Sequence, residues 1–215
     1  MIFLCGLSVF AKNVKVTLVA DGKSNSLEFN ENCTEITLSS VNGLISEISG
    51  LENFPRLEKL VCYNISFARN MHFAQKVSGV KVLVLQFCSF DDLDFLRDLP
   101  SLEAVSAPAS ATKFSPAYEI DFSENQHLAF FFLTHSQRNF KFKRIKALPP
   151  SMEVFSTPDA LFDMSNLRAL RDAGGGKLVF DFYEPIAEKL AGQGLEFATA
   201  ETYAKYNQKY NLGMK

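Results

Sequence analysis

The sequence predicts an α/β repeat protein, in which short strands stack side by side as one curved parallel sheet of a solenoid. The first observation is the stretch VKVLVLQFC at Val80 to Cys88, which has apolar side chains at Val80, Leu83 and Leu85. The second is its recurrence, with similar stretches centred on Ile36, Leu60, Leu83, Val105, Phe131, Phe155 and Phe180. Successive centres lie 24, 23, 22, 26, 24 and 25 residues apart. A period of this size is typical of repeat architectures, whose units bury their apolar faces only against their neighbours.

Composition supports a single folded unit and excludes some partners. The chain has 215 residues, of which 47 % are hydrophobic, with 21 Phe and no Trp, so we expect a core of Phe and Leu. A formal net charge of −2 gives no global attraction to nucleic acid or to an anionic membrane. The four cysteines include no C-x-x-C pair, and Cys62 and Cys88 are expected to be buried thiols.

Four segments divide the chain. Residues 1–11, MIFLCGLSVFA, are apolar and end in small residues, which suggests a signal peptide, although no Lys or Arg precedes the run. The alternative is that these residues form a first buried strand. Because the signal peptide is preferred, export to the periplasm or medium is slightly favoured over a cytoplasmic location. Residues 12–32 are predicted to be a β-hairpin cap, 33–183 a solenoid of about seven repeats, and 184–215 a C-terminal cap. Residues 1–11 are too few to span a bilayer.

Each element follows from its own pattern. VKVTLVA, DGKSN and SLEF predict a hairpin over 14–29. Among the segments that return from each strand, NMHFAQKV (70–77) and the stripe from Leu161 to Leu170 predict helices, DDLDFLRDLP (91–100) predicts a helical turn, and 113–125 is expected to be extended. After the repeats we expect a helix at 184–191, a strand at 195–198, and an amphipathic, Tyr-rich helix at 200–211 with Thr199 as its N-cap.

Two segments, ENFPRLEKL (52–60) and LDFLRDLPSLEAV (93–105), carry a family resemblance. Together with the spacing L-x-x-L-x-L-x-x-N/C, the region 33–183 resembles the leucine-rich repeat superfamily, and is closest to its irregular bacterial-type repeats of 22–26 residues. The chain departs from the family in having no Asn at the ladder position and in using Phe for Leu in the later repeats. The resemblance implies a binding scaffold whose curved parallel sheet holds another protein.

The expected binding surface is the concave side of that sheet, to which alternate strand residues point. It is unusually apolar and aromatic, and the residues assigned to binding are Val61, Tyr63, Val82, Val84, Phe130 and Phe132. Exposed apolar patches with aromatic anchors mark interaction sites. The alternative is that another part of the chain covers FFFL (130–133), so that the patch is ordinary packing or a site of self-association.

No catalytic, metal-binding or cofactor-binding residues are predicted. The run Gly174 to Lys177 precedes a strand and lacks the Ser or Thr of a phosphate loop, and His127 and His135 lie at opposite ends of one strand. The basic cluster of Lys141, Lys143, Arg144 and Lys146 is interpreted as a solvated edge. The predicted function is a non-enzymatic protein-binding scaffold that binds no nucleic acid. The alternative is a structural or self-associating exported repeat protein, for example a homodimer.

Overall fold

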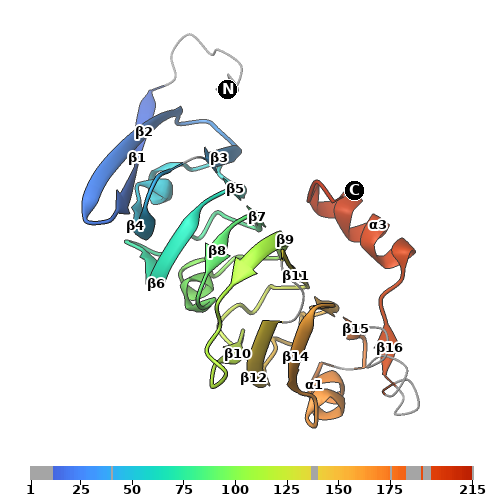
Figure 1. Ribbon diagram of the computed structural model, residues 1–215. Helices are drawn as coiled ribbons and strands as arrows, with labels where there is room; N and C mark the ends of the chain where they lie inside the picture. The colour runs from blue at the N-terminus through green and yellow to red at the C-terminus, as the bar shows by residue number, and fades with distance from the viewer. Residues whose placement is uncertain are drawn as a thin grey trace.

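The computed structural model describes residues 12–39, 41–136, 140–174, 176–182, 190 and 195–214. Its main feature is a row of parallel strands that we call the front layer (Figure 1). These strands are β3 (Glu35–Ser39), β5 (Lys59–Tyr63), β7 (Val82–Gln86), β9 (Ala104–Thr112), β11 (Phe130–His135), β13 (Val154–Ser156), β15 (Val179–Asp181) and β16 (Glu196–Phe197). The seven predicted centres, from Ile36 to Phe180, pair directly with one another in this order. The predicted parallel strands and their register are confirmed.

A second row of strands, which we call the back layer, lies on the other side of the core from the first. It comprises β1 (Asn13–Ala20), β2 (Lys23–Asn30), β4 (Leu44–Ser49), β6 (Ser66–Phe73) and β8 (Ser89–Phe90), and then β10 (Glu119–Asp121), β12 (Phe140–Ala147) and β14 (Ala160–Asp163). β9 is long enough to pair with β7 near its start and with β8 near its end, so the two layers are continuous there. β10, β12 and β14 form a separate parallel sheet.

The core fills the space between the two layers. Front strands contribute alternate side chains such as Leu60, Leu83 and Phe131, and the back layer contributes Phe90, Phe142 and others, all of them buried. The expected use of Phe is confirmed by stacked rings such as Phe131 on Phe155, with centroids 5.3 Å apart. Each fully buried Phe or Leu side chain contributes about 1.5–3 kcal/mol to folding.

The predicted N-terminal hairpin is confirmed as β1 and β2. Asp21 (φ 48°) and Gly22 (φ 73°) form its turn, and both adopt the left-handed conformation that a tight two-residue hairpin requires. β1 pairs antiparallel with β4, so the hairpin closes one end of the back layer. A Cβ at Gly50 (φ +91°) would lie 2.2 Å from the Lys15 carbonyl oxygen, so this close approach demands glycine.

The returning segments contain fewer helices than expected. The helix predicted at 70–77 is wrong, because residues up to Phe73 belong to β6, which pairs with β4 and β8. The turn at 91–100 is a 3₁₀ helix, η2 (Asp94–Asp98), and a shorter one, η1 (Leu51–Asn53), precedes β5. The sixth return is a strand, β14, followed by the helix α1 (Leu167–Ala173), so only the second part of the predicted stripe is helical.

The end of the described chain matches its prediction. β16 lies within 195–198 and extends the front layer, and α3 (Ala200–Tyr210) follows with Thr199 as its N-cap. The possible signal peptide at 1–11 falls outside the described residues, as does the helix expected at 184–191 apart from Leu190. No helix in the described part of the chain is long and apolar enough to cross a bilayer.

Candidate binding face

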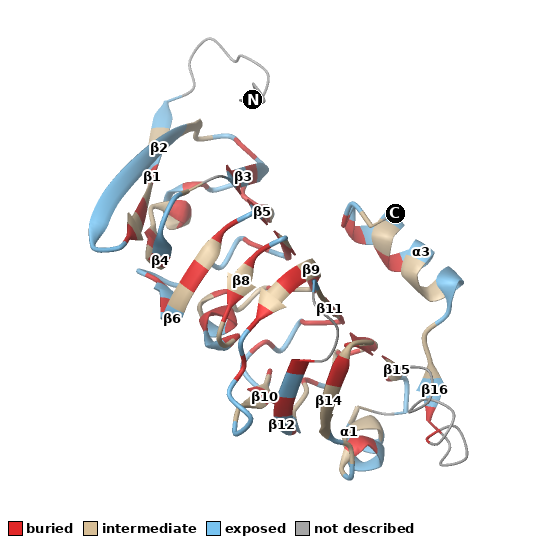
Figure 2. Ribbon diagram, in the orientation of Figure 1, coloured by how far each residue is buried: buried red, intermediate tan, exposed pale blue. Residues whose placement is uncertain are grey.

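The helix α3 lies against the outer side of the front layer. A second apolar cluster, separate from the core, joins the two, and we call its strand residues the covered face: Val61, Val82, Val84, Ala104, Phe130, Phe132, Val154 and Val179. The helix and the residues after it supply Tyr203, Tyr206, Tyr210, Leu212 and Met214. Along α3, Tyr206 and Tyr210 are buried, whereas Ala204 and Gln208 are exposed, and Figure 2 shows this mixture of buried and exposed positions on the helix.

The residues assigned to binding from the sequence do gather on this one face, but most of them are not exposed. Phe130 is fully buried, Val82 and Val84 are 8 % and 5 % exposed, and Val61 and Phe132 are half-buried. The expectation of an open patch is therefore wrong for these residues, because the chain's own helix occupies the surface. Tyr63 lies beyond the cluster and is 42 % exposed.

Aromatic stacking holds α3 in place. Tyr206 stacks on Phe130 with ring centroids 4.9 Å apart, and Tyr203 meets Phe132 edge to face at 5.6 Å. Such pairs contribute about 0.5–1.5 kcal/mol each beyond the area that they bury. The helix spans several strands, since Tyr203 bonds to residues of β13 and β15 while Lys59 Nζ of β5 donates to the carbonyl oxygen of Asn211, just beyond α3, at 2.8 Å.

Two tyrosine hydroxyls tie the helix to acids of the sheet. Tyr203 donates to Asp181, and Ser156 Oγ lies 2.8 Å from the same hydroxyl and 3.1 Å from Asp181 Oδ2. Tyr206 donates to Glu153. Burial and then the hydrogen bond to its acid raise the pKa of each tyrosine, so both stay protonated donors at neutral pH.

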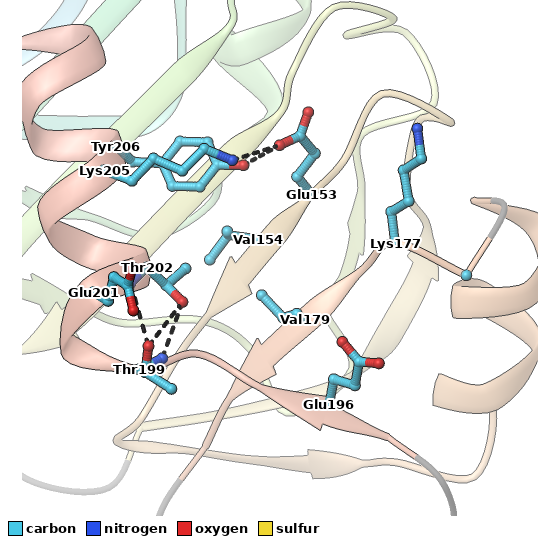
Figure 3. A pocket seen from close by; sticks show the side chains of 11 residues that line it. Glu153, Val154, Lys177, Val179, Glu196, Thr199, Glu201, Thr202, Lys205 and Tyr206 are labelled. Atoms are coloured by element: carbon cyan, nitrogen blue, oxygen red, sulfur yellow. Dashed lines mark hydrogen bonds and ion pairs between the residues drawn. The ribbon is translucent and has the colours of Figure 1, made fainter.

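Charged residues border the helix on one side. Figure 3 shows Lys205 and Tyr206 directed toward Glu153. These residues line a cleft of about 770 Å³ between the start of α3 and the last strands. Lys177, Glu196 and Glu201 also line this cleft. A second cleft, of about 410 Å³, lies beside the other end of the helix, where Glu103, Lys209 and Tyr210 meet Glu58 and Lys81. Both clefts are thus margins of the same helix-to-sheet contact.

Two hydroxyls in this contact, those of Ser106 and Tyr210, have no hydrogen-bond partner within the described residues. Ser106 lies between Val84 and Phe132 in the strand register and is 0 % exposed. Its hydroxyl makes no hydrogen bond within the described residues. A buried hydroxyl without a partner costs about 1–3 kcal/mol, so the fit between α3 and the sheet is incomplete at this point.

An exposed aromatic pair continues the face beyond the helix. Tyr63 and Phe87 meet edge to face with centroids 5.7 Å apart, and Phe87 is 48 % exposed. Phe87 also has φ 55°, a conformation that is rare for a bulky side chain and costs of the order of 1–3 kcal/mol.

Groups that would mark other chemistry are buried or paired. Cys62 and Cys88 lie in the core as expected, and burial raises the pKa of both thiols, that of Cys88 to about 12, which disfavours the reactive thiolate. Among the residues described, no group of three or more His, Cys, Asp or Glu side chains is placed to hold a metal. In the basic cluster, Lys143 and Arg144 pair with Glu119, and Lys146 pairs with Asp121, each at 2.9 Å.

Sequence reasoning missed the partners on both sides of this contact. Ser156, Asp181 and Glu153 matter because of Tyr203 and Tyr206, and the helix was expected only as a cap. The available signal was the coincidence of two unpaired apolar surfaces, the strand residues and the tyrosine stripe at 203, 206 and 210.

Comparison with known proteins found no family model and no curated protein that matches this chain.

Proposed function

We propose that the chain is a solenoid of the leucine-rich repeat type and a non-enzymatic protein-binding scaffold, whose covered face receives an amphipathic helix from another protein. The repeat assignment is supported by the parallel register at intervals of 22–26 residues, with an apolar residue at each centre. The binding role is supported by one observation, the seating of α3 on that face. A surface that holds one amphipathic helix has the shape and chemistry to hold a similar one.

The dimensions agree with this role. Strands about 4.8 Å apart make the eight-stranded front layer about 34 Å wide, whereas the 11 residues of α3 cover about 16 Å. The strip left open includes the Tyr63–Phe87 pair. A partner that also contacts this pair can gain aromatic contacts that α3 does not make.

Binding requires that α3 leave the face. The incoming helix must exceed the resident one in affinity, and the resident helix has a high effective concentration because it is tethered. The unpaired hydroxyl of Ser106 lowers the affinity of α3, since a competitor that bonds to it recovers the cost. Only partners that bind the covered face with an affinity high enough to displace the tethered α3 can therefore bind.

A peptide in solution tests this proposal on the full chain. The double substitution Tyr203→Ala/Tyr206→Ala weakens α3 while leaving the sheet intact. A fluorescent peptide of residues 199–214 is titrated against this variant and against the unmodified chain, and binding is followed by anisotropy. We expect at least tenfold tighter binding to the double variant, because its face is more often vacant.

Two further variants control the experiment. Gln208→Ala changes the exposed side of α3 and should leave binding as in the unmodified chain. Adding Phe132→Asp to the double variant should abolish binding by placing a charge on the face. If hydrogen exchange shows the amides of α3 deprotected in the double variant while those of β7 and β9 stay protected, and the peptide still does not bind, the proposed function is wrong.

A further inference from the structure

The acids along one margin of the covered face differ in how they are neutralised. Glu35 pairs with Lys59 at 3.0 Å and Glu58 with Lys81 at 2.7 Å, both within the front layer and the residues that lead into it. Glu103 and Glu153 occupy the same register position as Glu58, directly before β9 and β13. Within the part of the chain that the structure describes, neither has an ion pair with a cation of the sheet.

The helix supplies the missing positive charge. Lys205 Nζ lies 3.8 Å from Glu153 Oε2, and Lys209 lines the same cleft as Glu103, which Lys81, directly before β7, also borders. Successive helix residues are about 100° apart, so Lys205 and Lys209 form a stripe beside that of Tyr203, Tyr206 and Tyr210. The aromatic stripe thus meets the apolar strands while the lysine stripe meets the two acids.

We infer that the partner of the covered face is a basic, aromatic amphipathic helix, with aromatic residues at positions i, i+3 and i+7 and Lys or Arg at i+2 and i+6. The inference rests on the proposed function and specifies its ligand. An occupant without the cations leaves the partly buried carboxylates of Glu103 and Glu153 with no cation facing them from the helix, which is unfavourable. An acidic occupant meets direct repulsion from both.

Charge exchange tests the inference on the full-length Tyr203→Ala/Tyr206→Ala variant. Two labelled peptides are compared, the 199–214 sequence and the same sequence carrying Lys205→Glu/Lys209→Glu. We expect the reversed peptide to bind at least tenfold more weakly at low salt, and the difference to shrink in 1 M salt, where the screening length falls to about 3 Å.

The matched control reverses the sheet as well. With Glu103→Lys/Glu153→Lys added to the chain, the reversed peptide should regain its affinity to within about threefold and the original peptide should lose affinity. Circular dichroism establishes that this variant is folded, and if it is not, the salt dependence on the unreversed chain decides.

The outcomes separate the two proposals. Equal binding of both peptides at low salt shows a face indifferent to charge, which overturns the inference and leaves the proposed function standing. If neither peptide binds although hydrogen exchange shows that α3 is detached, both the proposed function and the inference are wrong.

Discussion

Two serines on the outer side of the front layer have the same side chain in opposite situations. Ser106 and Ser156 are both 0 % exposed, yet Ser156 bonds to Asp181 and Tyr203 whereas Ser106 has no partner within the described chain. We expect Ser106→Ala to raise the free energy of unfolding by about 1 kcal/mol and Ser156→Ala to lower it by about the same amount. Urea denaturation of the two variants measures this, and a loss of stability in both would contradict it.

Asp121, which pairs with Lys146 of the basic cluster, makes the stability of the fold depend on pH in the acid range. Burial opposes its ionisation, but hydrogen bonds from Ser123 and the contact with Lys146 outweigh burial and hold its pKa at about 2. This is below its value of about 3.9 in an unfolded chain, so ionised Asp121 stabilises the fold at neutral pH, and that contribution is lost as the pH falls from about 4 to 2.

The pH dependence of Asp121→Asn follows from that sign. The variant should melt at a lower temperature than the unmodified chain at pH 6, and the two melting temperatures should converge toward pH 2. The exposed Glu124, changed to Gln, serves as control and should leave the curve unchanged. A difference between Asp121→Asn and the unmodified chain that persists at pH 2 would argue against this account.

At the scale of elements, α3 is a helix whose stability depends on the sheet. Eleven residues are too few for a stable isolated helix, so its capping box at Thr199 and its tyrosine contacts sustain it. Ala204 points away from the sheet and is exposed. We expect Ala204→Pro to cost about 3 kcal/mol or more of helix stability and to increase the fluorescence of a hydrophobic dye that binds the uncovered face.

The control for this variant keeps the position and changes the chemistry. Ala204→Ser leaves the backbone donor in place. It should change the stability of the helix by no more than a few tenths of a kcal/mol and leave the dye fluorescence unchanged. Dye binding that does not rise with the proline variant, despite loss of helical circular dichroism, would mean that other residues cover the face.

The elements differ in how far the sequence predicts them. The front strands follow from the inward residues Ile36 to Phe180, because each unit repeats one apolar pattern. The strand β6 was missed because Phe73 and Val77, four residues apart and both buried, suit a helix as well as a strand with a following turn. The choice between helix and strand depends on pairing with the neighbouring strands β4 and β8. A short stretch of sequence does not reveal such pairing between repeats.

The sequence predicts which residues share the candidate face, but it does not predict that α3 covers most of them. Alternation in the strands identifies which side Val84, Phe130 and Phe132 occupy, and capping signals identify α3. The contact between them joins residues as far apart as Lys59 and Asn211, 152 positions. Neither local propensity nor periodicity contains that information, although an apolar face and an amphipathic helix in one chain each need a partner.

At the scale of the whole molecule, the covered face decides whether copies associate. The apolar strand residues are occupied within the chain, and the exposed large apolar side chains among the described residues are Leu27, Leu44, Tyr63 and Phe87. Leu27 and Leu44 lie on β2 and β4, away from the Tyr63–Phe87 pair on the front layer. We therefore expect a monomer, measured as a constant mass by light scattering across a concentration series.

A mass that rises with concentration would favour the self-associating alternative. Repeating the series with Tyr63→Ala then locates the contact, because loss of association would place it at the exposed aromatic pair. Tyr63 packs outside the core, so this variant should unfold at the same denaturant concentration as the unmodified chain.

The position of α3 in the chain has a consequence for biosynthesis. A ribosome completes every strand from β3 to β16 before it makes the segment that shields them, so for some seconds of elongation the rings of Phe130 and Phe132 meet only solvent or a chaperone. A message broken before the codon for Thr199 would yield a folded but adhesive product. The segment from Thr199 to Met214 thus shields these rings only after the strands that it covers have been made.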